Sequence, residues 1–188
     1  MADLPLVTIQ RLAKVLESYG IPYAIIGGVA VSIRAIPRYT KDVDAVLWVG
    51  ESDWEKILAQ VTQEGFTARA ENPISFAQKN RLLLLIDEDG TQIDLSFGAL
   101  PFEERMIRNA EPVEIASGCF ATVATAESLV VMKAIAWRPK DIQDIRDIAS
   151  INPDLDWNSV VEEFAEYAEL LETPERVPAL KELIRESI

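Results

Sequence analysis

Alternating apolar and polar positions divide the first part of the chain into predicted strands and a helix. Tyr23–Ile26 is a short run without a polar interruption, which is typical of a strand covered on both faces. Gly27 and Gly28 follow directly, at the point where the chain must turn from strand to helix. Val29–Ile36 can form two helical turns, which the next residue, a proline, ends. A second strand over Val43–Val49 completes a strand–helix–strand opening.

A hairpin is predicted farther along the chain, between Arg81 and Phe97. Its first arm, Arg81–Ile86, is almost continuously apolar, and its second arm, Thr91–Phe97, alternates after an acidic turn that contains glycine. Further strands are expected at 74–76, 113–115 and 119–123, the last two as edge strands. Helices are expected over 6–19, 53–63 and 101–109. The predicted fold class is α/β (α+β), with a mixed sheet and covering helices.

The pattern changes at Thr125, after which only helices are predicted. They are expected over about 128–138, 140–150 and 157–171, with a last helix that ends near Ser187. No repeat or flexible linker separates these helices from the preceding sheet. We therefore predict an α/β core, residues 1–124, and a helical C-terminal part, residues 125–188, that packs on the core.

Three aspartates are expected on one face of the predicted sheet. Asp42 and Asp44 stand two residues apart at the start of a strand, so alternation places both carboxylates on the same side. Asp94 lies on the second arm of the hairpin, where its apolar neighbours point the other way. Two acids at the start of a strand, next to a glycine turn, suggest a site for a metal ion and a phosphate.

Composition narrows the chemistry that the chain can perform. The 188 residues contain no histidine, which excludes Ser-His and Cys-His catalysis and histidine-bearing zinc sites. A single cysteine, Cys119, excludes an internal disulfide, fits a reducing cytoplasm and is expected in the core. The start of the chain does not read as a signal peptide, and no apolar run is long enough for a membrane span. We therefore expect a cytoplasmic protein without a membrane partner.

The order of these motifs resembles a known superfamily. Gly27-Gly28, thirteen further residues and then Asp42-Val43-Asp44 are similar to the signature of the polymerase-β-like nucleotidyltransferases. That superfamily carries a third carboxylate on a later strand, which Asp94 matches. The resemblance implies a mixed-sheet nucleotidyltransferase core.

Further residues narrow the resemblance to bacterial small nucleotidyltransferases. Arg38-x-Thr40, directly before the aspartate pair, is similar to the pattern in this group, which includes the AbiEii abortive-infection toxins. The C-terminal helices of the group carry a lysine and a cluster of basic and acidic residues. Lys133 and Arg138-Pro139-Lys140-Asp141 resemble these two features. A toxin–antitoxin role, with an antitoxin-like protein partner, is one implication.

The resemblance also implies a reaction, in which a nucleoside monophosphate passes from a triphosphate such as ATP to an acceptor hydroxyl. Two Mg²⁺ ions are expected, because a polyanionic triphosphate cannot approach carboxylates without cations. We expect Asp42, Asp44 and Asp94 to hold the metals, and Asp94 to take the acceptor's proton as well. The residues expected to bind the triphosphate are Gly27, Gly28, Arg38, Thr40 and Lys133.

Structural interpretations of the same residues stay open at this stage. Aspartates are common at strand ends, a glycine pair can simply form a tight turn, and Lys133 can extend from the edge of the core to water. Asp141, Asp144 and Asp147 recur every third residue and are expected to form a solvated stripe. A non-catalytic protein that keeps the fold and binds a partner is the alternative function.

The acceptor is not determined by the sequence. A net charge of −13, from 18 basic and 31 acidic residues, argues against broad non-specific binding to nucleic acid. A compact RNA end, a small cationic molecule and a basic protein are the acceptors that remain.

Overall fold

The computed structural model describes residues 4–188 of the chain, which forms two compact units. The first unit holds the chain up to Ala30 together with Arg38–Ala124. The second holds Val31–Pro37 together with Thr125–Ile188. That 31–37 belongs with the C-terminal helices was not predicted. The predicted domain division at 124 and the packing of the helical part on the core stay predictions.

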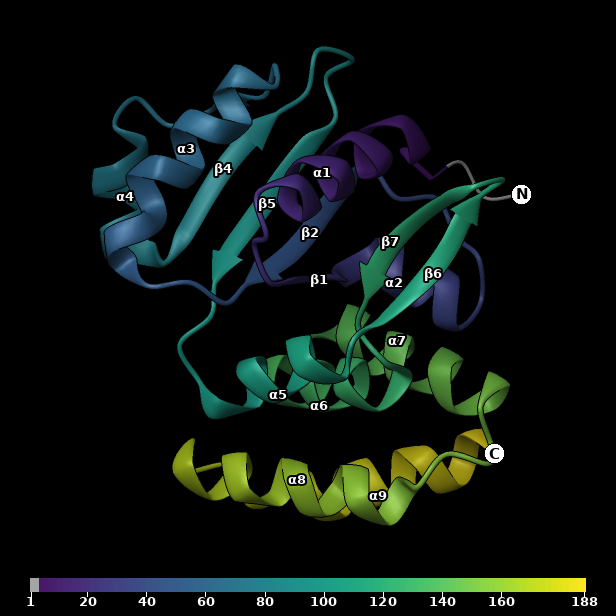
Figure 1. Ribbon diagram of the computed structural model, residues 1–188. Coiled ribbons are helices and arrows are strands. Elements are labelled where there is room, and N and C mark those ends of the chain that lie inside the picture. The colour runs from purple at the N-terminus through teal and green to yellow at the C-terminus, as the bar shows by residue number, and fades with distance from the viewer. Residues whose placement is uncertain (1–3) are drawn as a thin grey trace. The chain divides into compact units, whose positions relative to one another are not determined.

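One mixed sheet of seven strands forms the centre of the first unit, as far as residues 4–188 describe it, in the order β3-β4-β5-β2-β1-β7-β6 (Figure 1). Its strands are β1 (Tyr23–Ile26), β2 (Asp42–Leu47), β3 (Thr67–Ala68), β4 (Leu82–Ile86), β5 (Gln92–Phe97), β6 (Glu111–Ala116) and β7 (Cys119–Val123). β2 pairs antiparallel with β1 and parallel with β5. The predicted mixed α/β (α+β) fold is confirmed.

Helices of the first unit contact the strands of the sheet. They are α1 (Leu6–Ser18), α3 (Trp54–Gln63), α4 (Pro73–Asn80) and α5 (Pro101–Asn109), with a 3₁₀ turn over Glu51–Asp53 before α3. Of these, α3 covers the face that carries the apolar side chains. In Figure 1, α1 crosses in front of the strands. α2 (Gly27–Arg34) follows β1 directly. Among residues 4–188, no helix combines the length and the apolar character needed to cross a membrane.

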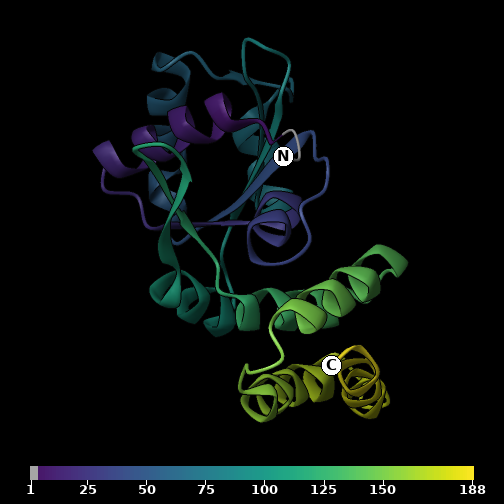
Figure 2. The same ribbon diagram turned by 90° about the vertical axis from the view of Figure 1, so that its right-hand side faces the viewer.

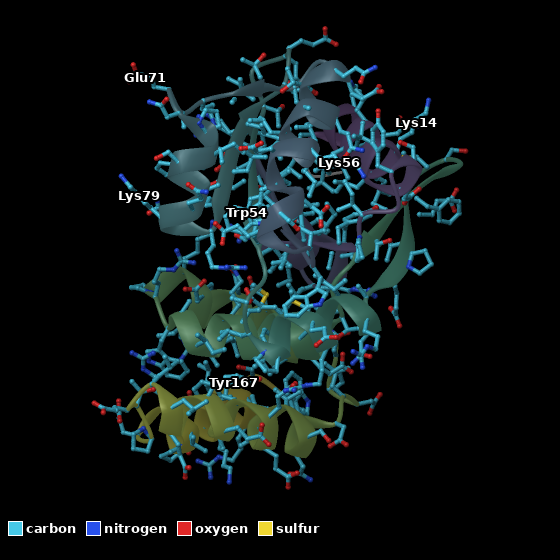
Figure 3. The ribbon with its side chains drawn as sticks, turned by 60° about the vertical axis from the view of Figure 1, so that its left-hand side comes forward. Lys14, Trp54, Lys56, Glu71, Lys79 and Tyr167 are labelled. Carbon is cyan, nitrogen blue, oxygen red and sulfur yellow. The ribbon has the colours of Figure 1, made fainter. Side chains whose placement is uncertain are left out.

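The two faces of the central strands differ in burial. On one face Val43, Ala45, Ile93 and Leu95 are fully buried. Trp54 of α3 stacks on Phe97 of β5 there, with ring centroids 4.2 Å apart. Trp54 is buried, whereas Lys56 of the same helix is exposed; both are labelled in Figure 3. The opposite face, which carries the aspartates, is only partly buried, so it is open to a ligand.

The second unit is helical, as its periodicity predicted. Its helices are α6 (Ala126–Ala136), α7 (Pro139–Ile151), α8 (Trp157–Leu170) and α9 (Arg176–Ser187). The side chain of Thr125 caps α6 by accepting from the Ser128 amide at 3.3 Å, and Asp156 caps α8 in the same way. α8 and α9 lie side by side (Figure 2).

Some predicted elements differ from the structure. Residues 74–76, expected as a strand, lie in α4, which begins at Pro73, a residue suited to the first helical position. The strand over 119–123 is not an edge strand, because β7 lies between β1 and β6. β3 was not predicted. α2 begins at Gly27, two residues earlier than expected, so the glycine pair forms its first turn. Cys119 is buried, as predicted.

Candidate active site

Strand register brings the three aspartates to one face of the sheet. Asp44 of β2 lies directly opposite Asp94 of β5 in the parallel pairing, and opposite Ile26 of β1 in the antiparallel pairing. Directly paired residues of neighbouring strands point to the same face. Asp42 precedes Asp44 by two residues and therefore shares this face. Asp42 is exposed, whereas Asp44 and Asp94 are half-buried.

The glycine pair packs against Asp44 and against two residues that precede the aspartates, Thr40 and Arg38. Gly27 has a φ of +63°, and a Cβ placed there would stand 1.9 Å from Oδ2 of Asp44. A Cβ on Gly28 would stand 2.7 Å from Oγ1 of Thr40 and 3.9 Å from Nη2 of Arg38. Both positions therefore need glycine for space, and Gly27 also needs it for backbone conformation. The turn thus brings Asp44, Thr40 and Arg38 to the first residues of α2.

The start of α2 adds backbone donors to this group of side chains. The first amide groups of a helix lack intrahelical acceptors and carry the positive end of the helix dipole. They begin at Gly27, which lies directly against the Asp44 carboxylate. A phosphate that binds at such a turn would meet backbone N–H groups together with the side chains of Arg38 and Thr40. The geometry therefore suits an anion held beside the aspartates.

Asp94 has a partner that the sequence did not reveal. Nη2 of Arg69 donates to Oδ1 of Asp94, and Nε of Arg69 donates to the carbonyl of Leu85 at 2.9 Å. Burial raises the pKa of Asp94, the Arg69 charge opposes that increase, and the nearby Asp42 charge adds to it. Arg69 was missed because it follows the two-residue strand β3, too short for alternation to be recognised.

The donor set suits a hard cation, although the carboxylates are not arranged around one. Carboxylate oxygens are the ligands that Mg²⁺ prefers. Within residues 4–188, however, no group of three or more acidic, cysteine or histidine side chains is positioned to hold a metal ion. Asp94 is paired with Arg69, and Asp44 packs against Gly27. The residues therefore fit Mg²⁺ by chemistry, and Oδ1 of Asp94 is already engaged by Arg69.

A surface cavity adjoins the start of β2. Its volume is about 310 Å³, and its lining includes Pro5, Tyr39, Thr40, Lys41, Asp89 and Thr91. Tyr39 is 61% exposed, and Nζ of Lys41 lies 5.8 Å from the centre of its ring. Thr40 belongs both to this cavity and to the contact with Gly28. Thr40 is therefore shared by the cavity and by the group of residues around the glycine turn.

Lys133 of the second unit lies in a buried cluster of charges. Its Nζ is 2.8 Å from Oδ2 of Asp144 and 3.3 Å from Oδ1 of Asp141. Arg138 donates to Asp141 from its amide at 3.1 Å and from Nε at 2.6 Å. Asp141 and Asp144 are buried, so the expected solvated stripe is wrong for both. The role of Lys133 in triphosphate binding stays a prediction.

The charges around Asp141 control its protonation. Burial alone would raise the pKa of Asp141, but the hydrogen bonds from Arg138 and the charge of Lys133 outweigh burial and lower it. The aspartate is thus held in its charged form inside the second unit. The contacts from α6 and from the residue before α7 tie the two helices together.

Comparison with solved structures finds the same fold in nucleotidyltransferase-like proteins. An antigenic nucleotidyltransferase-like protein from Paracoccidioides brasiliensis superposes with a TM-score of 0.57 at 20% identity, over 93% of this chain and 91% of that chain. The antibiotic-resistance factor ANT(2'')-Ia, in its solution structure, gives a TM-score of 0.51 at 17% identity, over 96% of this chain and 91% of that chain. The crystal structure of ANT(2'')-Ia in complex with adenylyl-2''-tobramycin gives a TM-score of 0.50 at 18% identity, over 96% of this chain and 97% of that chain.

Sequence comparison assigns the family. No curated protein matches the chain. A family described as "nucleotidyltransferase of unknown function (DUF6036)" matches residues 5–183, which is nearly the whole chain. The match includes every residue of the glycine turn, the three aspartates and Lys133. The chain therefore belongs to this nucleotidyltransferase family.

Proposed function

We propose that this protein is an active, metal-dependent enzyme that transfers a nucleoside monophosphate from a nucleoside triphosphate to an acceptor hydroxyl. One observation carries the proposal: Asp42, Asp44 and Asp94 share a sheet face beside a glycine turn that starts a helix. Three acids on one open face repel one another, which is poor for stability but useful for binding cations. Membership of a nucleotidyltransferase family supports the same reaction.

In this proposal the aspartates bind the metal ions, and other residues bind the triphosphate. Two unit charges about 4 Å apart repel by about 4 kcal/mol at an effective dielectric of about 20, so bare carboxylates would exclude a triphosphate. Asp42, Asp44 and Asp94 would hold two Mg²⁺ ions, which when bound neutralise phosphate charge and stabilise the entering and leaving oxygens. Asp94 would also accept the proton of the acceptor hydroxyl.

The glycine turn would bind the phosphates. Gly27 and Gly28 would let a phosphate approach the backbone at the start of α2, where the first amide groups of a helix lack intrahelical acceptors. Arg38 and Thr40 lie against Gly28 and would add a charge and a hydroxyl donor. Lys133 is retained as a proposed triphosphate ligand on the resemblance alone.

The acceptor is proposed to be compact. The cavity beside Thr40 has a volume of about 310 Å³, which suits part of a small molecule or one chain end rather than a long strand. The net charge of −13 favours a cationic small molecule or a basic protein over RNA. The Arg38-x-Thr40 pattern supports a relationship to the AbiEii-like group, for which a compact RNA end and an antitoxin-like partner remain proposals.

A non-catalytic, partner-binding protein is the second candidate, and one contact favours it. The pairing of Asp94 with Arg69 shows that the third acid has a counter-ion without any metal. A scaffold that no longer binds metal would keep such a pair. It would have no need of Gly27, however, whose absent Cβ leaves room for the Asp44 carboxylate.

Asp44→Asn tests the proposed function. The variant should fold and melt at the same or a higher temperature without metal, because it removes repulsion from Asp42 and Asp94. It should lose Mg²⁺-supported binding of ATP, measured by calorimetry, and the transfer of label from each α-labelled triphosphate to components of a cell extract. Asp53→Asn removes an equally negative charge from an exposed position before α3 and should change neither property. The proposal fails if Mg²⁺ changes nothing in the wild type.

A further inference from the structure

Arg69 is fixed in place by bonds that do not depend on Asp94. Its backbone amide donates to the carbonyl of Leu84 at 2.9 Å, and its Nε donates to the carbonyl of Leu85 at 2.9 Å. Both acceptors lie on β4, so the backbone and the near side of the guanidinium are held to this strand. The remaining Nη2 then reaches Asp94 on the next strand.

Register places Arg69 in line with the acids. β3 pairs with β4 through Ala68 opposite Leu85, which brings the following residue, Arg69, level with Leu84. Leu84 in turn lies opposite Asp94, and Asp94 opposite Asp44. Neighbouring strands are about 4.8 Å apart, so the long arginine side chain must pass over Leu84 to reach the carboxylate. Arg69 therefore extends along the open face of the sheet toward the site.

The pair is partly withdrawn from water. The side chains of Arg69 and Asp94 are 24% and 36% exposed. A charge-assisted bond in such a position is stronger than one between fully exposed side chains. The positive charge also offsets repulsion among the three acids. Asp94 thus has a cation of the protein itself at the carboxylate that the proposed metal needs.

We infer that Arg69 is an internal counter-ion that competes with the metal for Asp94, so that it sets the metal affinity of the site. The inference rests on the proposed function, because it takes Asp94 as a metal ligand. A metal ion at Asp94 would compete with the bond from Nη2, which engages Oδ1, while the bonds of Arg69 to β4 persist. Arg69 is a positioning residue in this scheme: it holds the Asp94 carboxylate when no metal is present and releases it when metal binds.

Arg69→Gln tests the inference through metal affinity, without any assay of turnover. Mn²⁺ is the probe, because free Mn²⁺ is counted directly by electron paramagnetic resonance. The variant should bind Mn²⁺ about tenfold more tightly than the wild type, a change that corresponds to about 1.4 kcal/mol. Thermal melting checks that both proteins are folded.

Arg81→Gln is the matched control. Arg81 is also anchored to the sheet, with its Nε and Nη2 donating to the carbonyls of Phe97 and Gly98 at 2.8 and 2.7 Å. Both variants lose one positive charge, but the bonds of Arg81 end on carbonyl oxygens and not on a carboxylate of the site. Its Mn²⁺ affinity should stay within about twofold of the wild type, since distant charges are screened.

The outcomes separate this inference from the proposed function. If Asp44→Asn loses Mn²⁺ binding while Arg69→Gln binds as the wild type does, the competition is refuted and the metal site stands. If neither the wild type nor Arg69→Gln binds Mn²⁺ at millimolar concentration, the metal site is refuted, and the competition with it.

A second variant covers the case in which Arg69→Gln does not fold. Arg69→Lys keeps the charge but replaces the rigid, planar guanidinium with a single ammonium group on a shorter chain, so it holds Leu85 and Asp94 less firmly. It should bind Mn²⁺ about two- to threefold more tightly, because the weaker pair is easier to break. In the unmodified protein, Mg²⁺ should shift the NMR signal of the Arg69 side chain. An unchanged affinity in Arg69→Lys, together with an unshifted signal, would overturn the inference.

Discussion

Gly27 shows which part of a site can be predicted from one residue and which part cannot. A glycine pair after a strand predicts a turn, because glycine adopts backbone conformations that other residues avoid. The sequence does not show that the space of the missing Cβ is taken by Oδ2 of Asp44, 1.9 Å away. That contact depends on the pairing of β1 with β2, which sets Ile26 opposite Asp44. Arg69 was missed for the same reason, since its partner lies two strands away.

Gly27→Ala should therefore cost more stability than its backbone conformation explains. A positive φ costs an alanine about 1–2 kcal/mol, and the new methyl group would also collide with the Asp44 carboxylate. Gly20→Ala is the control, because Gly20 has a φ of +64° but nothing within 4 Å of the position of its Cβ. Urea unfolding should show the larger loss for Gly27→Ala, and only this variant should lose Mg²⁺-supported ATP binding. Equal losses and retained binding would contradict the role of the turn.

Helices and strands were predictable where the pattern was long, and uncertain where it was short. The alternation of β5 and the apolar run of β4 gave the hairpin to within one residue at each end. Residues 74–76 were assigned to the wrong class, because three residues with apolar ends fit a strand and a helix equally well. Asp141 and Asp144 of α7 were expected at the surface, as aspartate usually is. Their partner Lys133 belongs to another helix, and periodicity within α7 cannot reveal it.

Lys133→Met should destabilise the second unit by about 3–5 kcal/mol, since it leaves the carboxylates of Asp141 and Asp144 buried without this ammonium group. Arg138→Gln removes a side chain that is 71% exposed and should cost less. Denaturant unfolding, followed by tryptophan fluorescence, to which Trp137 between α6 and α7 contributes, measures both.

The same variant should weaken the dependence of stability on pH. In the wild type the pKa of Asp141 is lowered by folding, so its contribution is present above its unfolded pKa of about 3.9 and is lost as the pH falls through the folded value. Lys133→Met removes one of the charges that lower this pKa, while the hydrogen bonds from Arg138 remain. The folded pKa of Asp141 should then lie nearer its unfolded value, so that less stability is lost between neutral and low pH than in the wild type. A variant as stable as the wild type at neutral pH would show that Lys133 is not part of the structural support of this unit.

Charge distribution over the whole molecule limits what the site can accept. The chain has 18 basic and 31 acidic residues, and no run of five or more basic residues occurs in it. In the first unit, the basic residues next to the aspartates are Arg38, Lys41 and Arg69, and the last is already paired with Asp94. So few cations suit one triphosphate and a compact acceptor, but they cannot follow the backbone of a long nucleic acid.

Random duplex DNA and unstructured RNA should therefore bind poorly. Non-specific affinity comes from the neutralisation of phosphates by basic side chains, and the dependence of binding on salt counts the cations engaged. Fluorescence anisotropy at low and moderate salt should show no binding of either polymer at micromolar protein, whereas ATP with Mg²⁺ binds in the same preparation and shows that the site is intact. Micromolar binding of random duplex with a steep salt dependence would mean that basic residues from different parts of the chain form a continuous groove. Tight binding of one RNA end with little dependence on salt would have the opposite meaning, because an RNA terminus needs only a few phosphate contacts. RNA termini would then be favoured over cationic small molecules as the acceptor.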